Sequence, residues 1–187
     1  RDPDHSLVGS EMCIRDRRNT TPGLPVDRTG LLPMIRDRWA FSLNGYVPAF
    51  RARHMRALRA QLPDAFYARL EGVSDSETLF HLALASLAEG ASPGTALRSV
   101  RDVVQGRLGP RETAPMTMVL AGPGGFTVLH TTINGEVNSL YVREGGELIG
   151  RGVLVASERL DETDGWEAVP PHSLLEVRGG SCEIEPL

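Results

Sequence analysis

The chain has 187 residues, enough for one domain with a single sizeable core, and 41% of them are hydrophobic, as in ordinary globular proteins. Its 20 Lys and Arg residues against 24 Asp and Glu residues leave a net charge of -4, a field that does not attract nucleic acid or anionic membranes. No apolar run approaches the roughly 18 residues that span a bilayer, and the start lacks the layout of a signal peptide. These features favour a cytoplasmic protein with a small neutral or zwitterionic partner.

The first 17 residues differ in character from the rest of the chain. The string from Ser6 to Arg17, SLVGSEMCIRDR, resembles the translation of a sequencing adapter, of the kind that recurs at the ends of gene models. We interpret it as a disordered, non-native scar, with an ordinary N-terminal arm as the alternative. The sequence therefore predicts a scar over residues 1–17 and a partial domain over residues 18–187.

Cysteine and histidine spacing gives no indication of a metal or a cofactor. Cys13 and Cys182 lie near opposite ends of the chain, and two cysteines do not make a disulfide framework. His81 and His130 lack metal-ligand spacing and are predicted to be packing or surface residues. The acidic stretch over residues 161–164 is predicted to be a solvated loop, with a cation site as the alternative.

Turn residues and short apolar patterns organise the first half. Pro, Gly and Thr are frequent from Arg18 to Asp37, which predicts loop. Residues 39–43 predict a short buried strand that the turn-forming pair Asn44-Gly45 ends. A helix is expected after Pro48, because apolar residues recur there at spacings of three and four: Ala52, Met55, Leu58 and Leu62. The arginines among them favour a solvated helix face, with a nucleic-acid groove as the alternative: Arg51, Arg53, Arg56 and Arg59.

Two more helices and a β-rich second half follow. The helices are predicted from residues 74–77 to about Gly90, and from about Ser92 to Gln105. The later strands are predicted at 116–120, 126–133, 137–142 and 153–157, separated by turn residues, so antiparallel hairpins are expected. The run Val153–Ala156 is apolar throughout, which predicts a strand covered on both faces. The fold class is therefore α+β.

Polar groups in three short stretches suit the recognition of an amino acid. Residues 74–77, SDSE, fit a capping box that leaves Asp75 without a role. An amino acid needs an anion for its ammonium and a cation for its carboxylate, which Asp75 and Arg18 supply. Between them, Asn44 and Gly45 offer an amide side chain and a backbone N–H to a developing oxyanion. A helix cap and a simple turn are the structural alternatives.

In sequence order these stretches resemble the motifs of class II glutamine amidotransferases. Residues 18–23 (RNTTPG), 39–45 (WAFSLNG) and 74–77 (SDSE) are similar to the family patterns RxATxG, (H)NG and (S/T)D(S/T)E. Residues 155–158 (VASE) and 165–170 (GWEAVP) resemble the closing segment of the stand-alone amidases of ergothioneine biosynthesis, the γ-glutamyl-hercynylcysteine sulfoxide hydrolases. The resemblance covers the chain from about Arg18 to its end.

The resemblance implies an Ntn-hydrolase αββα four-layer sandwich, here incomplete at its N-terminus, in which an N-terminal cysteine attacks a γ-glutamyl amide. It implies that Arg18, helped by Thr21, binds the substrate α-carboxylate, and that Asp75 binds the α-ammonium group. The Asn44 side chain and the Gly45 N–H would form the oxyanion hole.

One departure from the family pattern affects the chemistry. The nucleophile has no counterpart, because Cys13 belongs to the scar and Cys182 to the C-terminal tail; Leu43 also replaces the usual His, but no catalytic group is assigned to that position. The expected function is hydrolysis of a γ-glutamyl amide, with γ-glutamyl-hercynylcysteine sulfoxide as the substrate. Because the nucleophile is missing, this chain itself is expected to be inactive. A non-catalytic γ-glutamyl-binding module is the alternative. No nucleic acid, membrane or cofactor is expected as a partner, and the oligomeric state, a homodimer included, is left open.

Overall fold

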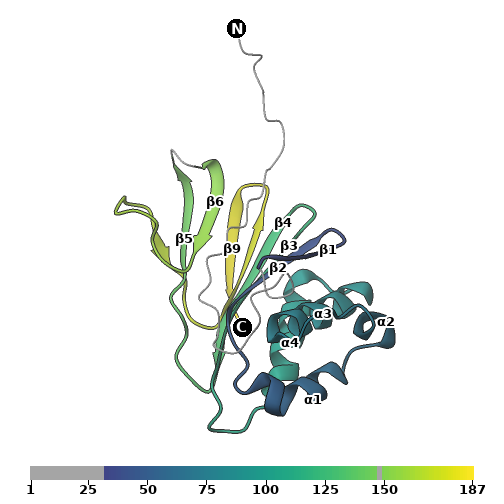
Figure 1. Cartoon of the computed structure of the whole chain (residues 1–187). Helices are drawn as coiled ribbons and strands as arrows, with labels where there is room; N and C mark the ends of the chain where they lie inside the picture. The colour runs from purple at the N-terminus through teal and green to yellow at the C-terminus, as the bar shows by residue number, and fades with distance from the viewer. Residues whose placement is uncertain (1–31, 147–148) are drawn as a thin grey trace.

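A six-stranded antiparallel sheet forms the centre of the fold. The computed structural model describes residues 32–146 and 149–187 (Figure 1). The strand order of the large sheet is β1-β2-β3-β4-β8-β9. Its strands are β1 (Met34–Arg36), β2 (Trp39–Gly45), β3 (Ala114–Gly122), β4 (Gly125–Ile133), β8 (Ser173–Arg178) and β9 (Ser181–Pro186). A smaller sheet has the order β6-β5-β7, from β5 (Tyr141–Gly146), β6 (Gly150–Ala156) and β7 (Glu167–Ala168).

Two long helices cover one face of the large sheet (Figure 1): α3 (Asp75–Ala88) and α4 (Pro93–Gln105). Each begins at a serine cap: the Ser74 hydroxyl accepts a hydrogen bond from the Glu77 N–H at 3.2 Å, and Ser92 caps α4 in the same way. Both predicted helices are confirmed, with ends within two residues. No helix in the described ranges is long and apolar enough to cross a membrane.

The main core lies between the large sheet and these helices. Phe41 of β2 stacks on Phe80 of α3, with ring centroids 5.3 Å apart. Every residue of α3 from Asp75 to Ala85 is buried, because the sheet, α4 and the short helices α1 (Met55–Arg59) and α2 (Asp64–Tyr67) surround it. The contact of β2 with α3 therefore brings the end of β2 close to the start of α3.

The small sheet packs on the other face of the large one. A second hydrophobic core lies between the two sheets, where Val128 and Leu175 of the large sheet pack against Leu140, Val142 and Val169. The described residues thus form three layers, helices, large sheet and small sheet, and the α+β class is confirmed. A second helical layer is not found in residues 32–146 and 149–187, so the four-layer αββα sandwich and its N-terminal incompleteness stay predictions.

Several predicted elements differ from the structure. Residues 34–36 were expected in a loop but form β1, because Asp37, with φ 54°, turns the chain back onto β2. Asn44 and Gly45 are not a turn: they are the last paired residues of β2. Residues 153–156 are half-buried rather than covered on both faces, since β6 is an edge strand of the small sheet. The β8–β9 hairpin was not predicted.

The helix expected after Pro48 is irregular. Ala49, with φ 46°, precedes a π-helical turn, η2 (Phe50–His54), and α1 follows it directly. This extra turn shifts the helix face, so that Ala52 is exposed and His54 is buried. The predicted apolar stripe therefore fails at its first residue.

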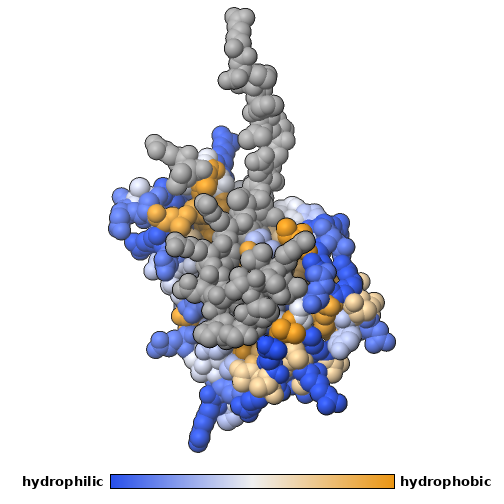
Figure 2. All heavy atoms as spheres, viewed as in Figure 1, coloured by the Kyte–Doolittle hydropathy of each residue, from blue (hydrophilic) through white to orange (hydrophobic). Residues whose placement is uncertain are grey.

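Exposed large hydrophobic side chains are scattered over separate elements. They are Ile35, Tyr46, Tyr67, Leu160 and Ile184. In Figure 2 the orange atoms of the described residues likewise form small areas between hydrophilic ones. The described part of this face has no single extended apolar surface.

The four arginines near α1 do not share one solvated face. Arg59 donates to the Gly72 carbonyl at 2.8 Å and to the Thr78 hydroxyl at 3.2 Å, and its guanidinium lies 3.8 Å from the Glu77 carboxylate. Its side chain is only 14% exposed. Arg59 therefore ties α1 to the start of α3, whereas Arg56 is exposed.

We predict that Arg59→Met lowers the free energy of unfolding by about 1–3 kcal/mol, because the Gly72 carbonyl and the Thr78 hydroxyl lose their donor and the buried Glu77 loses its ion-pair partner. Arg56→Met removes the same charge from the same helix and should change stability by less than about 0.5 kcal/mol. Urea unfolding of both variants measures the difference. Equal effects would show that Arg59 contributes nothing beyond its charge.

Candidate functional site

The end of β2 presents a backbone donor at an edge that no strand of the described residues pairs. Asn44 pairs with Thr117 and Gly45 with Met116 in β3. The Tyr46 N–H donates to the Pro115 carbonyl at 3.3 Å. Because successive N–H groups of a strand point to opposite sides, the Gly45 N–H points away from β3, to the edge that β1 pairs only as far as Phe41. That direction suits a donor to a bound ligand.

Position 45 accepts no side chain. A Cβ atom there would lie 1.9 Å from the Pro115 carbonyl oxygen, and the backbone has φ 154°. Glycine is thus required for β2 to approach β3 this closely while Gly45 keeps its N–H at the edge.

Asp75 joins the start of α3 to the chain that leaves β2. Its carboxylate is buried, with 8% of the residue exposed. One oxygen accepts from the Val47 N–H at 2.9 Å and the other from the Ser76 N–H at 2.8 Å. Val47 is two residues after Gly45, so the structure brings Asp75 to the strand end that carries Asn44. A carboxylate has about four acceptor sites, which leaves capacity for an ammonium group.

Glu77 has a different role from the one the capping box predicts. Its carboxylate accepts from the Glu71 N–H at 2.7 Å and the Gly72 N–H at 2.8 Å, rather than from the amide of Ser74. The loop before α3 is therefore anchored on Glu77, which leaves Asp75 as the carboxylate of this turn that faces β2.

Asn138 completes the group around Asn44, and sequence reasoning missed it. It lies between β4 and β5, in a stretch predicted to be strand. Its side-chain amide donates to the Asn44 carbonyl oxygen at 3.2 Å and lies 3.3 Å from Asn44 Oδ1. Next to it, the Ser139 hydroxyl donates to the Ser157 carbonyl at 2.7 Å. No local pattern marks Asn138, because its partner is 94 residues away.

A row of polar residues crosses the large sheet at the level of Asn44. Register pairs Asn44 with Thr117, Thr117 with His130, and His130 with Ser173. His130 is 1% exposed, and its Nδ1 lies 3.1 Å from the Thr117 hydroxyl. Burial, with a smaller contribution from nearby His172, lowers the pKa of His130 to about 4. This histidine is therefore neutral at pH 7.

Three sequence-predicted residues lie outside the described residues: Arg18, Thr21 and Cys13. Cys182 is described, on β9 at the far edge of the large sheet. Four strand spacings separate β9 from β2, roughly 19 Å. Burial also raises the pKa of the Cys182 thiol, which disfavours the thiolate. Cys182 is thus excluded from the site around Asn44.

The acidic stretch at 161–164 is a loop with residues 162–164 exposed, as predicted, but Asp161 is half-buried and bound by neighbouring side chains. The Asp161 carboxylate accepts from Trp166 Nε1 at 3.0 Å and lies 3.3 Å from the Arg143 guanidinium. Hydrogen bonds from Thr163 and then Trp166 hold the pKa of Asp161 below its usual value. Within the described ranges, no cluster of three or more His, Cys, Asp or Glu residues is arranged to hold a metal.

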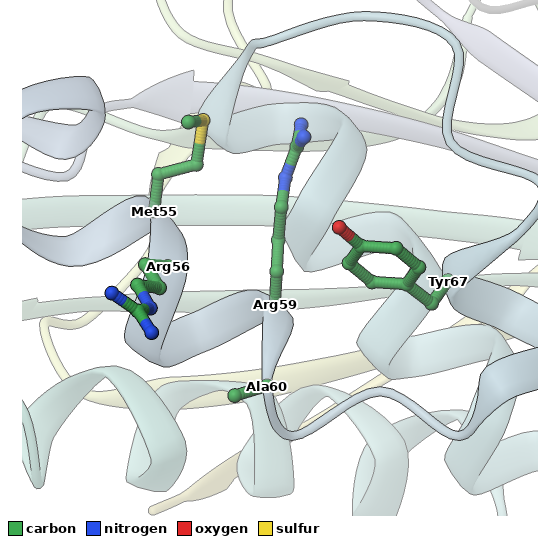
Figure 3. Close-up of a pocket in the computed structure, with 5 residues that line it drawn as sticks. All are labelled: Met55, Arg56, Arg59, Ala60 and Tyr67. Atoms are coloured by element: carbon green, nitrogen blue, oxygen red, sulfur yellow. The ribbon is translucent and has the colours of Figure 1, made fainter.

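A cavity of about 340 Å³ lies beside the short helices, away from β2 (Figure 3). Its lining residues are Met55, Arg56, Arg59, Ala60 and Tyr67. The Arg59 guanidinium is already bound to Gly72 and Thr78. Neither Asn44, Gly45 nor Asp75 lines this cavity, so we place the candidate site at the end of β2.

We predict that Gly45→Ala lowers the free energy of unfolding by about 1–3 kcal/mol, because β2 and β3 must separate to admit the methyl group. Gly106→Ala is the matched control: its nearest neighbour would be 3.5 Å away, and its φ of -67° suits any residue. Thermal unfolding compares the two. A Gly45→Ala variant as stable as Gly106→Ala would contradict the close approach described here.

We predict that His130 stays neutral until pH falls to about 4. In the unfolded chain histidine is protonated near pH 6.5. Between pH 6.5 and pH 4 only the unfolded state therefore binds this proton, so the free energy of unfolding decreases as the pH is lowered through this range. NMR titration of the imidazole measures the pKa, and His130→Gln should remove this part of the stability slope. Protonation near pH 6.5 in the folded protein would refute the burial effect.

Comparison with known proteins supports the fold through structure alone. No family model matches the chain, and no curated protein matches it by sequence. A glutamine aminotransferase class-II domain protein from Silicibacter pomeroyi matches with a TM-score of 0.66 and 26% identity, over 80% of this chain and 68% of that one. A predicted glutamine amidotransferase from Pseudomonas aeruginosa PA01 matches with a TM-score of 0.58 and 16% identity, over 83% and 65%.

A purine enzyme shares the same arrangement. The glutamine phosphoribosylpyrophosphate amidotransferase from B. subtilis matches with a TM-score of 0.50 and 17% identity, over 82% of this chain and 31% of its own. The chain thus spans about two thirds of the two domain proteins and less than a third of the purine enzyme. The described residues have the fold of class II glutamine amidotransferase domains, and these neighbours support a place in the Ntn-hydrolase amidotransferase superfamily.

Proposed function

We propose that the native gene product hydrolyses a γ-glutamyl amide, with the Asn44 side-chain amide and the Gly45 N–H as oxyanion donors. The observation that carries this proposal is the buried hydrogen bond from Val47 to Asp75. It sets a carboxylate that can bind an ammonium group beside a strand end that offers two donors. An amino-acid head group and a developing oxyanion need these two features close together.

The geometry supports catalysis as well as binding. Gly45 is locked against Pro115, and Asn44 is held by Asn138, so both donors are fixed before a substrate arrives. Donors that are already oriented stabilise charge that develops in the transition state without a cost for reorganisation.

The remaining groups of the proposed reaction lie outside the described residues. Arg18, with Thr21, would bind the α-carboxylate, and an N-terminal cysteine would attack the amide carbonyl. Its α-amino group, with a pKa of about 7.7–8.0, would take the thiol proton and return it to the leaving amine. Water would then release glutamate from the thioester.

Glutamate release from L-glutamine and γ-glutamyl amides tests this proposal. A polypeptide made as printed begins with Arg1, so it should show no turnover beyond background. Under this proposal the native gene product carries an N-terminal cysteine, so it should release glutamate. If the native protein binds glutamate but cleaves no amide, the rival function, a γ-glutamyl-binding module, is correct.

We predict that Asn44→Ala lowers the kcat of the native enzyme by about 10²–10³, the cost of one oxyanion donor. Asp75→Asn should mainly raise KM, because the ammonium charge is present before the reaction. Glu77→Gln is the control for Asp75: it changes a buried carboxylate of the same turn that binds only backbone N–H groups and Arg59. Glu77→Gln should reduce thermal stability and leave KM unchanged.

Equal effects of Asn44→Ala and Asp75→Asn on both kcat and KM would refute this division of roles.

The proposed substrate is γ-glutamyl-hercynylcysteine sulfoxide, with the trimmed amine as product. Support comes from the family-like residues 155–158 and 165–170, which flank one strand: Tyr141 of β5 pairs with Ala156 on one side and Ala168 on the other. Asn138 and Ser139, just before β5, contact Asn44 and Ser157. Both family-like segments thus contact the few residues that follow Asn138, which supports this substrate assignment.

We predict that the native enzyme has a higher kcat/KM for γ-glutamyl-hercynylcysteine sulfoxide than for L-glutamine, since discrimination is the ratio of these values. A competition assay with both substrates present measures that ratio. A preference for free glutamine would overturn the substrate assignment without affecting the proposed reaction type.

A further inference from the structure

We propose that Asn138 is a positioning residue that fixes which end of the Asn44 side-chain amide faces the reaction. The inference rests on the proposed function for its catalytic consequence, but the orientation itself rests on two contacts. Asn138 Nδ2 lies 3.2 Å from the backbone oxygen of Asn44 and 3.3 Å from Asn44 Oδ1.

The backbone contact decides the orientation of both amides. A carbonyl oxygen can only accept a hydrogen bond, so the end of Asn138 that faces it must be the NH₂ group. The side-chain atom of Asn44 beside that same NH₂ must then also be an acceptor. Oδ1 therefore faces Asn138, and Asn44 Nδ2 points away with both of its hydrogens.

The orientation matters because an asparagine amide has one donor end and one acceptor end. With Oδ1 held by Asn138, the donor end faces away, where an oxyanion can accept from it. After a flip, an oxygen with lone pairs would face the developing negative charge instead. Asn138 would therefore determine whether Asn44 stabilises or opposes the transition state.

Asn138 is itself held by the small sheet. The neighbouring Ser139 hydroxyl donates to the Ser157 carbonyl at 2.7 Å, and the Leu140 carbonyl accepts from the Val169 N–H at 2.9 Å. Leu140 is also buried in the core between the two sheets. The two residues that follow Asn138 are thus bound, one to the chain after β6 and the other to the chain after β7.

The decisive variant is Asn138→Asp, which keeps the shape and replaces the donor with an acceptor. Asn44 should flip so that Nδ2 donates to the new carboxylate. Asn138→Ala removes the donor without adding an acceptor, so it should leave Asn44 free to sample both orientations. Asn134→Asp is the control, because Asn134 also donates its amide to two backbone carbonyls, of Gly109 and Glu112, far from Asn44.

NMR of the ¹⁵N-labelled 187-residue chain tests the orientation without turnover. In Asn138→Asp, the Asn44 side-chain NH₂ should shift downfield and exchange more slowly with water than in the unmodified chain. Asn134→Asp should leave that signal unchanged. An Asn44 NH₂ signal that is the same in Asn138→Asp and in the unmodified chain would overturn the inference.

Kinetics of the native enzyme then test the consequence. Asn138→Asp should lower kcat by about 10²–10³ and leave KM unchanged, and Asn138→Ala should be less damaging. A purely structural role predicts the reverse order, because alanine removes more contacts than aspartate does. If the NMR signal shows the flip but kcat is unchanged, Asn138 positions Asn44 and the assignment of Asn44 as an oxyanion donor fails. If kcat falls more in Asn138→Ala than in Asn138→Asp, the positioning role fails.

Discussion

The hydrogen bond between the Val47 N–H and the Asp75 carboxylate is the constraint on which the candidate site depends. It joins the chain that leaves the sheet to Asp75, the first residue of a helix that is buried from Asp75 to Ala85, at 2.9 Å. A buried carboxylate is stable only when its oxygens are satisfied, and here two backbone N–H groups satisfy them. The same bond therefore stabilises the fold and fixes the end of β2 in space.

Around that bond, three elements fix the end of β2 independently. β3 approaches so closely that only glycine fits at position 45, α3 supplies Asp75, and the segment before β5 supplies Asn138. β3 fixes the path of the backbone, α3 supplies the negative charge, and the segment before β5 orients the Asn44 amide. The segment that leads into the small sheet thus reaches the candidate site through Asn138, which lies in none of the family-like stretches.

How far the sequence predicts this arrangement depends on how local each signal is. Both long helices follow from caps and apolar spacing within a few residues, and Asp75 and Asn44 stand out through motifs of two to four residues. The roles of Glu77 and Arg59 could not be predicted, because their partners are set by the loop before α3. Asn138 was missed because its sequence neighbours give no pattern: its contact with Asn44 forms only when β2 meets the chain before β5, 94 residues away. The π-helical turn at Phe50–His54 shifted the start of the helix predicted after Pro48, so the apolar spacing held from Met55 onward but not at Ala52.

The distance along the chain between Asn44 and Asn138 also has a consequence for how the protein folds. The hairpin of β3 and β4 closes across a tight turn, whereas the contact between these two asparagines closes a loop of 94 residues. Loop-closure entropy makes such long-range contacts costly until the intervening structure exists. The orientation of the Asn44 amide should therefore be established late, after the sheet and helices have assembled.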